Sequence, residues 1–155
     1  MPANDFQLTS SAFEHCESIP PKYTCRGDNV SPELVWSEPP ENTRSFVLIV
    51  DDPDAPGGTF THWVLADIPA EARKLDEGDA DAGVAGANDF GSSIYGGPCP
   101  PEGHGKHRYY FTLYALDRES LDVNRGAARA DVETALAGHV LGQAQLVGTF
   151  EQPAK

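Results

Sequence analysis

Short runs of apolar, β-branched and aromatic residues alternate along this chain with segments rich in glycine and proline. Runs at 45–52, 61–68 and 107–117 have the length and composition of β-strands, and a terminal strand is expected at 145–152. The 15 glycines and 13 prolines lie between such runs, as the turns of a many-stranded fold require. The pattern predicts a mainly β fold, a sandwich of antiparallel sheets.

One substantial helix is expected, close to the C-terminus. Asp131 can cap the N-terminus of the segment 132–144, although Gly138 lowers the helix propensity of that segment. The segment 76–89 holds five acidic residues and no Lys or Arg, which favours a solvated loop. No repeat or linker interrupts the chain, so residues 1–155 are expected to form a single domain.

Charge and hydropathy narrow the classes of function. The net charge of -13 argues against binding nucleic acid through its phosphates and against anionic membrane surfaces. No segment approaches the roughly 20 apolar residues of a membrane span, and the N-terminus does not resemble a secretion signal. We therefore expect a cytoplasmic protein with no integral membrane segment.

The three cysteines, Cys16, Cys25 and Cys99, are too few for a disulfide framework and do not have zinc-site spacing. We expect three reduced thiols, with a single bridge left open as the alternative. No cofactor and no structural metal are expected.

Side chains two residues apart in a strand share a face. By this rule, each of the three central strands has a largely apolar face that carries one titratable side chain near its end. The three predicted faces are Phe46, Leu48, Val50 and Asp52; Phe60, His62, Val64, Ala66 and Ile68; and His107, Tyr109, Phe111, Leu113 and Ala115. If these strands are neighbours, Asp52, His62 and His107 converge where the core opens into a pocket.

The segment 95–111 supplies a loop for such a pocket. Its glycines allow close approach of the backbone to a ligand, and its prolines stiffen the loop. It lacks the spacing of a nucleotide phosphate loop. A rigid turn and a ligand clamp are equally consistent with the loop's composition.

Four motifs follow one another along the chain in this order: "DPDAP", "HWV", "GGPCPPEG" and "HRYYFTLYALD". With "GDNVSPELVW" and the tail "GHVLGQAQLVGTFEQ", this set resembles the phosphatidylethanolamine-binding protein family. The bacterial and archaeal Raf kinase inhibitor-like branch is the most similar one. The resemblance implies a β-sandwich with a small anion-binding cavity at one end, little helix, and a homodimer.

The resemblance also assigns residues to the expected site. Its pocket residues fall on Asp52, His62, Gly97, Cys99, Pro101, His107 and Tyr109. Asp54 and Pro56 would shape the first loop, where a cis bond before the proline is expected.

The chemistry of these residues suits a small anion such as phosphate, a phosphomonoester or a phospholipid head group. His62 and His107 would donate N–H groups to the ligand, and Asp52 would accept the other N–H of a histidine and so fix its orientation. The Tyr109 hydroxyl would be an additional donor in the pocket wall. We expect no catalysis.

Three alternatives stay open. Asp52, His62 and His107 have the residue types of a two-histidine, one-carboxylate metal site, which would make the protein a metal-dependent enzyme. A hydrolase using Ser92 or Ser93 is less favoured because the nucleophile-elbow motif is absent. A regulatory inhibitor with a kinase or a protease as its protein target is the third.

Overall fold

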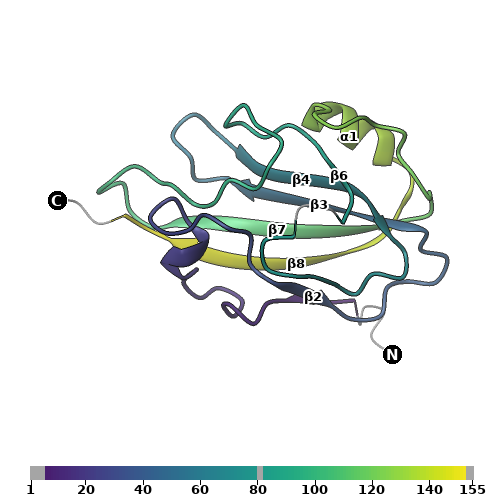
Figure 1. The fold of residues 1–155 in the computed structure, drawn as a ribbon, viewed down its shortest axis with the longest axis horizontal. Helices are drawn as coiled ribbons and strands as arrows, with labels where there is room; N and C mark the ends of the chain where they lie inside the picture. The colour runs from purple at the N-terminus through teal and green to yellow at the C-terminus, as the bar shows by residue number, and fades with distance from the viewer. Residues whose placement is uncertain (1–5, 80–81, 153–155) are drawn as a thin grey trace.

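The computed structural model describes residues 6–79 and 82–152. Eight β-strands, one 3-10 turn and one α-helix make up these parts of the chain (Figure 1). In order they are β1 (Leu8–Thr9), η1 (Pro21–Tyr23), β2 (Leu34–Trp36), β3 (Ser45–Asp52), β4 (Phe60–Pro69), β5 (Lys74–Leu75), β6 (Val84–Ala85), β7 (His107–Leu116), α1 (Arg129–Leu136) and β8 (Val140–Phe150).

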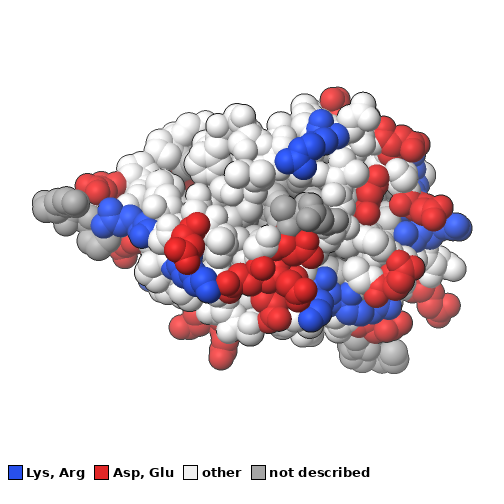
Figure 2. Space-filling view, in the orientation of Figure 1, with Lys and Arg blue, Asp and Glu red and all other residues white. Residues whose placement is uncertain are grey.

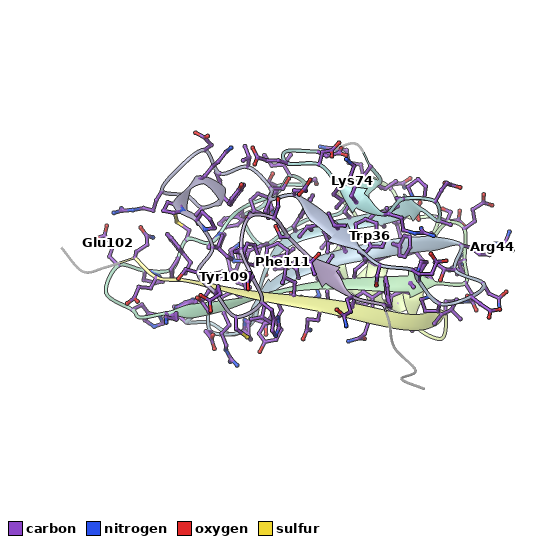
Figure 3. The ribbon with its side chains drawn as sticks, turned by 90° about the horizontal axis from the view of Figure 1, so that it is seen from below. Trp36, Arg44, Lys74, Glu102, Tyr109 and Phe111 are labelled. Atoms are coloured by element: carbon purple, nitrogen blue, oxygen red, sulfur yellow. A yellow bond between two sulfur atoms is a disulfide. The ribbon has the colours of Figure 1, made fainter. Side chains whose placement is uncertain are left out.

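The strands form two sheets, each with antiparallel pairing throughout. A sheet of five strands has the order β6-β4-β3-β7-β8, and a smaller sheet has the order β1-β2-β5. The main core fills the space between them, with Trp36 contributed by the small sheet and Phe46 and Phe111 by the large one. Figure 3 shows Trp36 and Phe111 inside the molecule, Arg44 at one end and Glu102 at the other. This confirms the predicted mainly β sandwich.

The outer face of the large sheet is covered by the segment that includes α1. Val47 and Ile49 of β3 pack there with Val64 of β4, Leu121 and Val132, forming a second, smaller core. Arg129, at the start of α1, donates hydrogen bonds to the side chains of Asp51 and Thr61 on the same face. The helix is therefore fixed to the sheet by apolar burial and by one ion pair.

The predicted helix was correct in place but wrong in extent. It has eight residues, starts two residues before Asp131, and is preceded by Ala128, which makes no side-chain cap. Gly138 adopts a left-handed φ of 82° just beyond the helix, a conformation that ends helices. The residues from Val140 onward belong to β8, which pairs along its length with β7.

The predicted face of β4 was wrong because two extra residues interrupt its pairing with β3. Trp63 pairs with Val50 while Thr61 pairs with Asp51, which leaves His62 as an extra residue in a β-bulge. A second register shift occurs around Asp67, whose φ is 58°. The inward-facing apolar residues of β4 are therefore Trp63, Leu65 and Ile68, whereas Val64 and Ala66 belong to the outer core.

The expectation of three reduced thiols was wrong. Cys25 and Cys99 form a disulfide across 74 positions of sequence, and Cys16 is free and exposed. The bond joins the turn after η1 to the loop before β7. Spacing along the chain gave no indication of this pair, because the fold alone brings the two segments together.

Two smaller expectations also need correction. The expected cis bond before Pro56 is absent, since the described residues contain no cis peptide bond. The acidic segment 76–89 is only partly a solvated loop, because β6 lies within it and pairs with β4; residues 80–81 fall outside the described parts. No helix in 6–79 or 82–152 has the length and hydropathy of a membrane span.

Candidate functional site

A cavity of about 210 Å³ opens at the end of the sandwich where β3 ends and β4 and β7 begin. Of the predicted site residues, it brings together Asp52, Pro56, His62, Cys99, Pro101 and His107, along with Ala55, Phe60, Phe90 and Pro100. Asp54, Gly97 and Tyr109 lie nearby but do not line it. The convergence of Asp52, His62 and His107 is therefore present in the structure.

Asp52 holds His107 from one side. The Oδ2 atom of Asp52 lies 2.6 Å from Nδ1 of His107, and the Oδ1 atom accepts the amide N–H of Asp54 at 2.7 Å. Both side chains are buried. An ionised carboxylate only accepts hydrogen bonds, so Nδ1 of His107 carries the proton and donates. The predicted orienting role of Asp52 thus has a matching geometry.

The other ring nitrogen of His107 contacts His104, a residue outside the predicted site. Nε2 of His107 lies 2.6 Å from Nδ1 of His104, an exposed side chain between Gly103 and Gly105. Asp52, His107 and His104 form one hydrogen-bonded chain from the buried end of β3 to the surface. The sequence signal for His104 was its position three residues before His107, in a loop that brings the two rings together.

His62 is held differently. Its Nδ1 lies 2.7 Å from the carbonyl oxygen of Gly96, and its ring packs against Phe60, Phe90 and Tyr109 with centroids 5.0 to 5.2 Å apart. Burial lowers the pKa of His62, and the Gly96 carbonyl and the charge of Asp52 oppose this shift only in part. The β-bulge explains how His62 reaches the cavity while its neighbour Trp63 enters the main core.

Asp54 lies in the loop after β3, outside the cavity, and contacts the start of β7. Its carboxylate accepts hydrogen bonds from the guanidinium of Arg108 and from the amide of the same residue, at 2.8 and 2.9 Å. The hydrogen bond to Arg108 lowers the pKa of Asp54 to about 2. The loop after β3 is therefore joined to the start of β7 by an ion pair.

The predicted close approach at Gly97 is made to the protein itself. Its amide donates to Oδ1 of Asn29 at 2.8 Å, and a Cβ at this position would lie only 2.1 Å from the carbonyl oxygen of Tyr23. The disulfide and a bond from Cys25 N to the Pro98 carbonyl lie in the same place. Gly97 thus shapes the loop and does not face the cavity.

Tyr109 does not line the cavity, and its ring lies behind the lining residues His62 and His107. Its side chain is fully buried, and its hydroxyl has no hydrogen-bond partner among the described residues. Burial, followed by the negative charge of Asp52, raises the pKa of this hydroxyl. In Figure 3, Tyr109 lies on β7 between Phe111 and the end of the molecule that carries Glu102.

The enzyme alternatives receive no geometric support. Within 6–79 and 82–152, no group of three or more His, Cys, Asp or Glu side chains is arranged to hold a metal ion. Ser92 Oγ accepts the amide N–H of Ile94, and no hydrogen bond described here joins Ser92 or Ser93 to a histidine.

Charged side chains are unevenly distributed on the face seen in Figure 2. Acidic residues gather along the lower half and the right end of this view, whereas the upper left is nearly free of charge. The loops after β3 and before β7 reach that part of the molecule in Figure 1. Phe90 and Ile94, which are 47% and 56% exposed, belong to the same loop region.

Comparison with known proteins agrees with this architecture. The family model described as phosphatidylethanolamine-binding protein matches residues 9–151. The chain belongs to this family. Relatives include a UPF0098 protein of Aquifex aeolicus, 49% identical over 94% of this chain and 88% of the relative. Another, from Methanothermobacter thermautotrophicus, is 47% identical over 94% of this chain and 98% of the relative.

Solved structures of the family confirm the fold and the prokaryotic branch. The homolog CT736 of Chlamydia trachomatis superposes with a TM-score of 0.90 at 40% identity, covering 97% of this chain and 99% of that one. YbcL of E. coli gives a TM-score of 0.90 at 34% identity, covering 96% and 99%. A carboxypeptidase Y inhibitor, at 17% identity and a TM-score of 0.54 over 95% and 82%, shares the fold only.

Proposed function

We propose that this protein is a non-enzymatic binder of small anions such as phosphate, phosphomonoesters or phospholipid head groups. One observation carries the proposal: a single cavity at the end of the sandwich is lined by His62, by the Asp52–His107 pair and by the proline-rich loop. Membership of the phosphatidylethanolamine-binding protein family supports it.

The electrostatics predict weak binding. The net charge of -13 repels anions at long range, although salt screens this repulsion beyond about 8 Å at physiological ionic strength. Attraction must therefore come from short-range hydrogen bonds inside the cavity. The mainly apolar lining, which includes Phe60, Phe90 and Pro100, suits an anion that carries an organic group.

Titration calorimetry with phenyl phosphate tests the proposal. His62→Ala should weaken binding about tenfold or more, because a hydrogen bond to a charged ligand contributes about 1.5–3 kcal/mol. His139→Ala is the matched control, since His139 is an exposed histidine bonded to Asp117 at the opposite end of β7. Absence of binding to the wild type would reject the function, and equal affinities in wild type and His62→Ala would reject this pocket.

A role as an inhibitor of a kinase or a protease is the second proposal. The exposed side chains of Phe90 and Ile94 favour it, because Asn88 holds their loop rigidly with four hydrogen bonds and so presents both side chains beside the cavity. Inhibition of a purified kinase or protease should be lost in Phe90→Ala and Ile94→Ala. It should persist in Val35→Ala, which alters an exposed apolar residue on β2.

We also propose a cytoplasmic homodimer. Val140 and Leu141 support self-association, since both are exposed apolar side chains at the start of the edge strand β8. Light scattering at micromolar concentration should give about twice the 16.6 kDa chain mass. A mass of one chain would contradict the dimer.

A further inference from the structure

One ring nitrogen of His62 makes a hydrogen bond within the protein, and the other makes none to a described residue. Nδ1 lies 2.7 Å from the carbonyl oxygen of Gly96, and a carbonyl can only accept, so Nδ1 carries a hydrogen and donates it. The amide of Gly96 in turn donates to the backbone carbonyl of His62 at 3.2 Å, which fixes the orientation. Nε2 makes no hydrogen bond to any described residue, and His62 lines the cavity. In the neutral ring this nitrogen is an acceptor.

The surroundings of His62 favour the neutral ring. The residue is 3% exposed, and Phe60, Phe90 and Tyr109 pack around its ring. The charged groups that act on it are Asp52 on β3 and Asp89 in the loop after β6, and both favour the charged form. Burial outweighs them and lowers the pKa of His62.

The other polar groups of the cavity determine which hydrogen bonds a ligand can make there. Both ring nitrogens of His107 are occupied, by Asp52 and by His104, and Pro100 and Pro101 have no N–H. Among the described residues, the amide N–H groups of Ala55 and Cys99 donate to no acceptor. The lining thus contains one imidazole acceptor and a buried carboxylate that repels a second negative charge, and the amides of Ala55 and Cys99 are the backbone donors that a ligand could use.

We infer that this cavity selects acids that are singly ionised and still carry one O–H group, with His62 Nε2 accepting that O–H. The inference rests on the proposed anion-binding function and names its ligand class: the monoanion of a phosphomonoester, in preference to its dianion or to a sulfate ester. The ionised oxygen of such a ligand would bind the backbone N–H groups, and its organic group would contact the apolar wall.

Phenyl phosphate and phenyl sulfate separate the alternatives. At about pH 5.5 most phenyl phosphate is a monoanion with an O–H, because the second pKa of a phosphomonoester is near 6. Phenyl sulfate has the same shape and a single negative charge but no O–H. By calorimetry, phenyl phosphate should bind about tenfold tighter, the value of one hydrogen bond to a buried acceptor. Its affinity should fall as the pH rises above about 6.

His62→Gln provides the matched variant. The amide of glutamine can donate as well as accept, so the preference for phenyl phosphate should largely disappear in this variant. In the wild-type complex, the nitrogen NMR signal of His62 Nε2 should remain that of an unprotonated nitrogen, a readout that does not depend on the folding of any variant.

The outcomes are distinct. Equal binding of the two esters, tighter binding of phenyl sulfate, or a protonated Nε2 in the complex would overturn the inference and leave anion binding in place. An unchanged preference in His62→Gln would also overturn it, because another group would then accept the O–H. If neither ester binds, the proposed function itself fails.

Discussion

The carboxylate of Asp52 and the imidazole of His107 are joined at 2.6 Å, although 55 positions of sequence separate them. The two residues lie at the ends of neighbouring strands, β3 and β7, whose pairing runs from Ser45 opposite Leu116 to Asp51 opposite Tyr110. The contact is thus positioned by the ladder of the central sheet. Because both residues line the cavity, a change that breaks this contact should alter both the stability of the fold and the shape of the cavity.

Removing this carboxylate should destabilise the protein. Asp52→Ala leaves the buried Nδ1–H of His107 without an acceptor, which costs about 1–3 kcal/mol. Asp52→Asn retains an amide oxygen that can accept and should cost less. Urea denaturation measures both free energies of unfolding. An Asp52→Ala variant as stable as the wild type would show that the bond contributes nothing.

The stability should depend on pH through His62. Because burial lowers the pKa of His62 below its ordinary value of 6.5, the unfolded chain binds the proton more readily than the folded one. The resulting stabilisation is complete above the unfolded pKa and is lost as the pH falls through about 6.5 and below. The wild type should therefore lose more unfolding free energy than His62→Gln between pH values of about 7.5 and 5. Denaturation in buffers free of phosphate tests this, and parallel pH profiles would contradict it.

The disulfide should contribute substantially to stability. Closing a loop of 74 positions between Cys25 and Cys99 restricts the unfolded chain by an amount that the entropy model places at about 4.5 kcal/mol, and measured effects are typically about 2–4 kcal/mol. A reducing agent, or Cys99→Ser, should lower the unfolding free energy by about 2–4 kcal/mol. Cys16→Ser is the control: because Cys16 forms no disulfide, replacing it should leave the loss of stability on reduction unchanged.

Gly97 should tolerate no side chain. A Cβ there would lie 2.1 Å from the Tyr23 carbonyl oxygen and 2.6 Å from Asn29 Oδ1, so the loop must move. Gly97→Ala should destabilise the protein by about 1–3 kcal/mol and weaken phenyl phosphate binding. Gly57→Ala is matched, since a Cβ at Gly57 meets no atom within 4 Å. Similar effects of the two substitutions would show that close packing at Gly97 is unimportant.

Local sequence pattern predicted β3, β4, β7 and its face, and it predicted the last strand but began it at 145 instead of Val140. It did not predict the short strands β1, β2, β5 and β6. Alternation sufficed on β7 because Phe111 and Leu113 keep an unbroken register with β3, and Tyr109 continues the same face in register with β8. It failed on β4, where residues are added at His62 and near Asp67, because a bulge is defined by the partner strand and leaves no period of its own. The family resemblance placed His62 in the pocket despite that failure.

The parts of the site that were missed depend on contacts between distant segments or on an exposed loop. The Cys25–Cys99 bond needs the turn after η1 to lie on the loop before β7, which no local pattern encodes. His104 was missed because nothing in the composition of its loop predicts that its ring turns back onto His107. Gly97 was predicted to bind the ligand, whereas the structure packs it against Tyr23 and Asn29 and does not place it in the lining of the cavity.

The bulge at His62 places a cavity residue outside the regular pairing of its strand. His62 has no pairing partner on β3, so it takes no part in the backbone ladder that aligns Trp63 with Val50. Selection can therefore exchange this residue, and with it the chemistry offered to a ligand, without shifting the register of the strand. The same sandwich can in this way diversify its ligands through a single position while its hydrophobic interior stays the same.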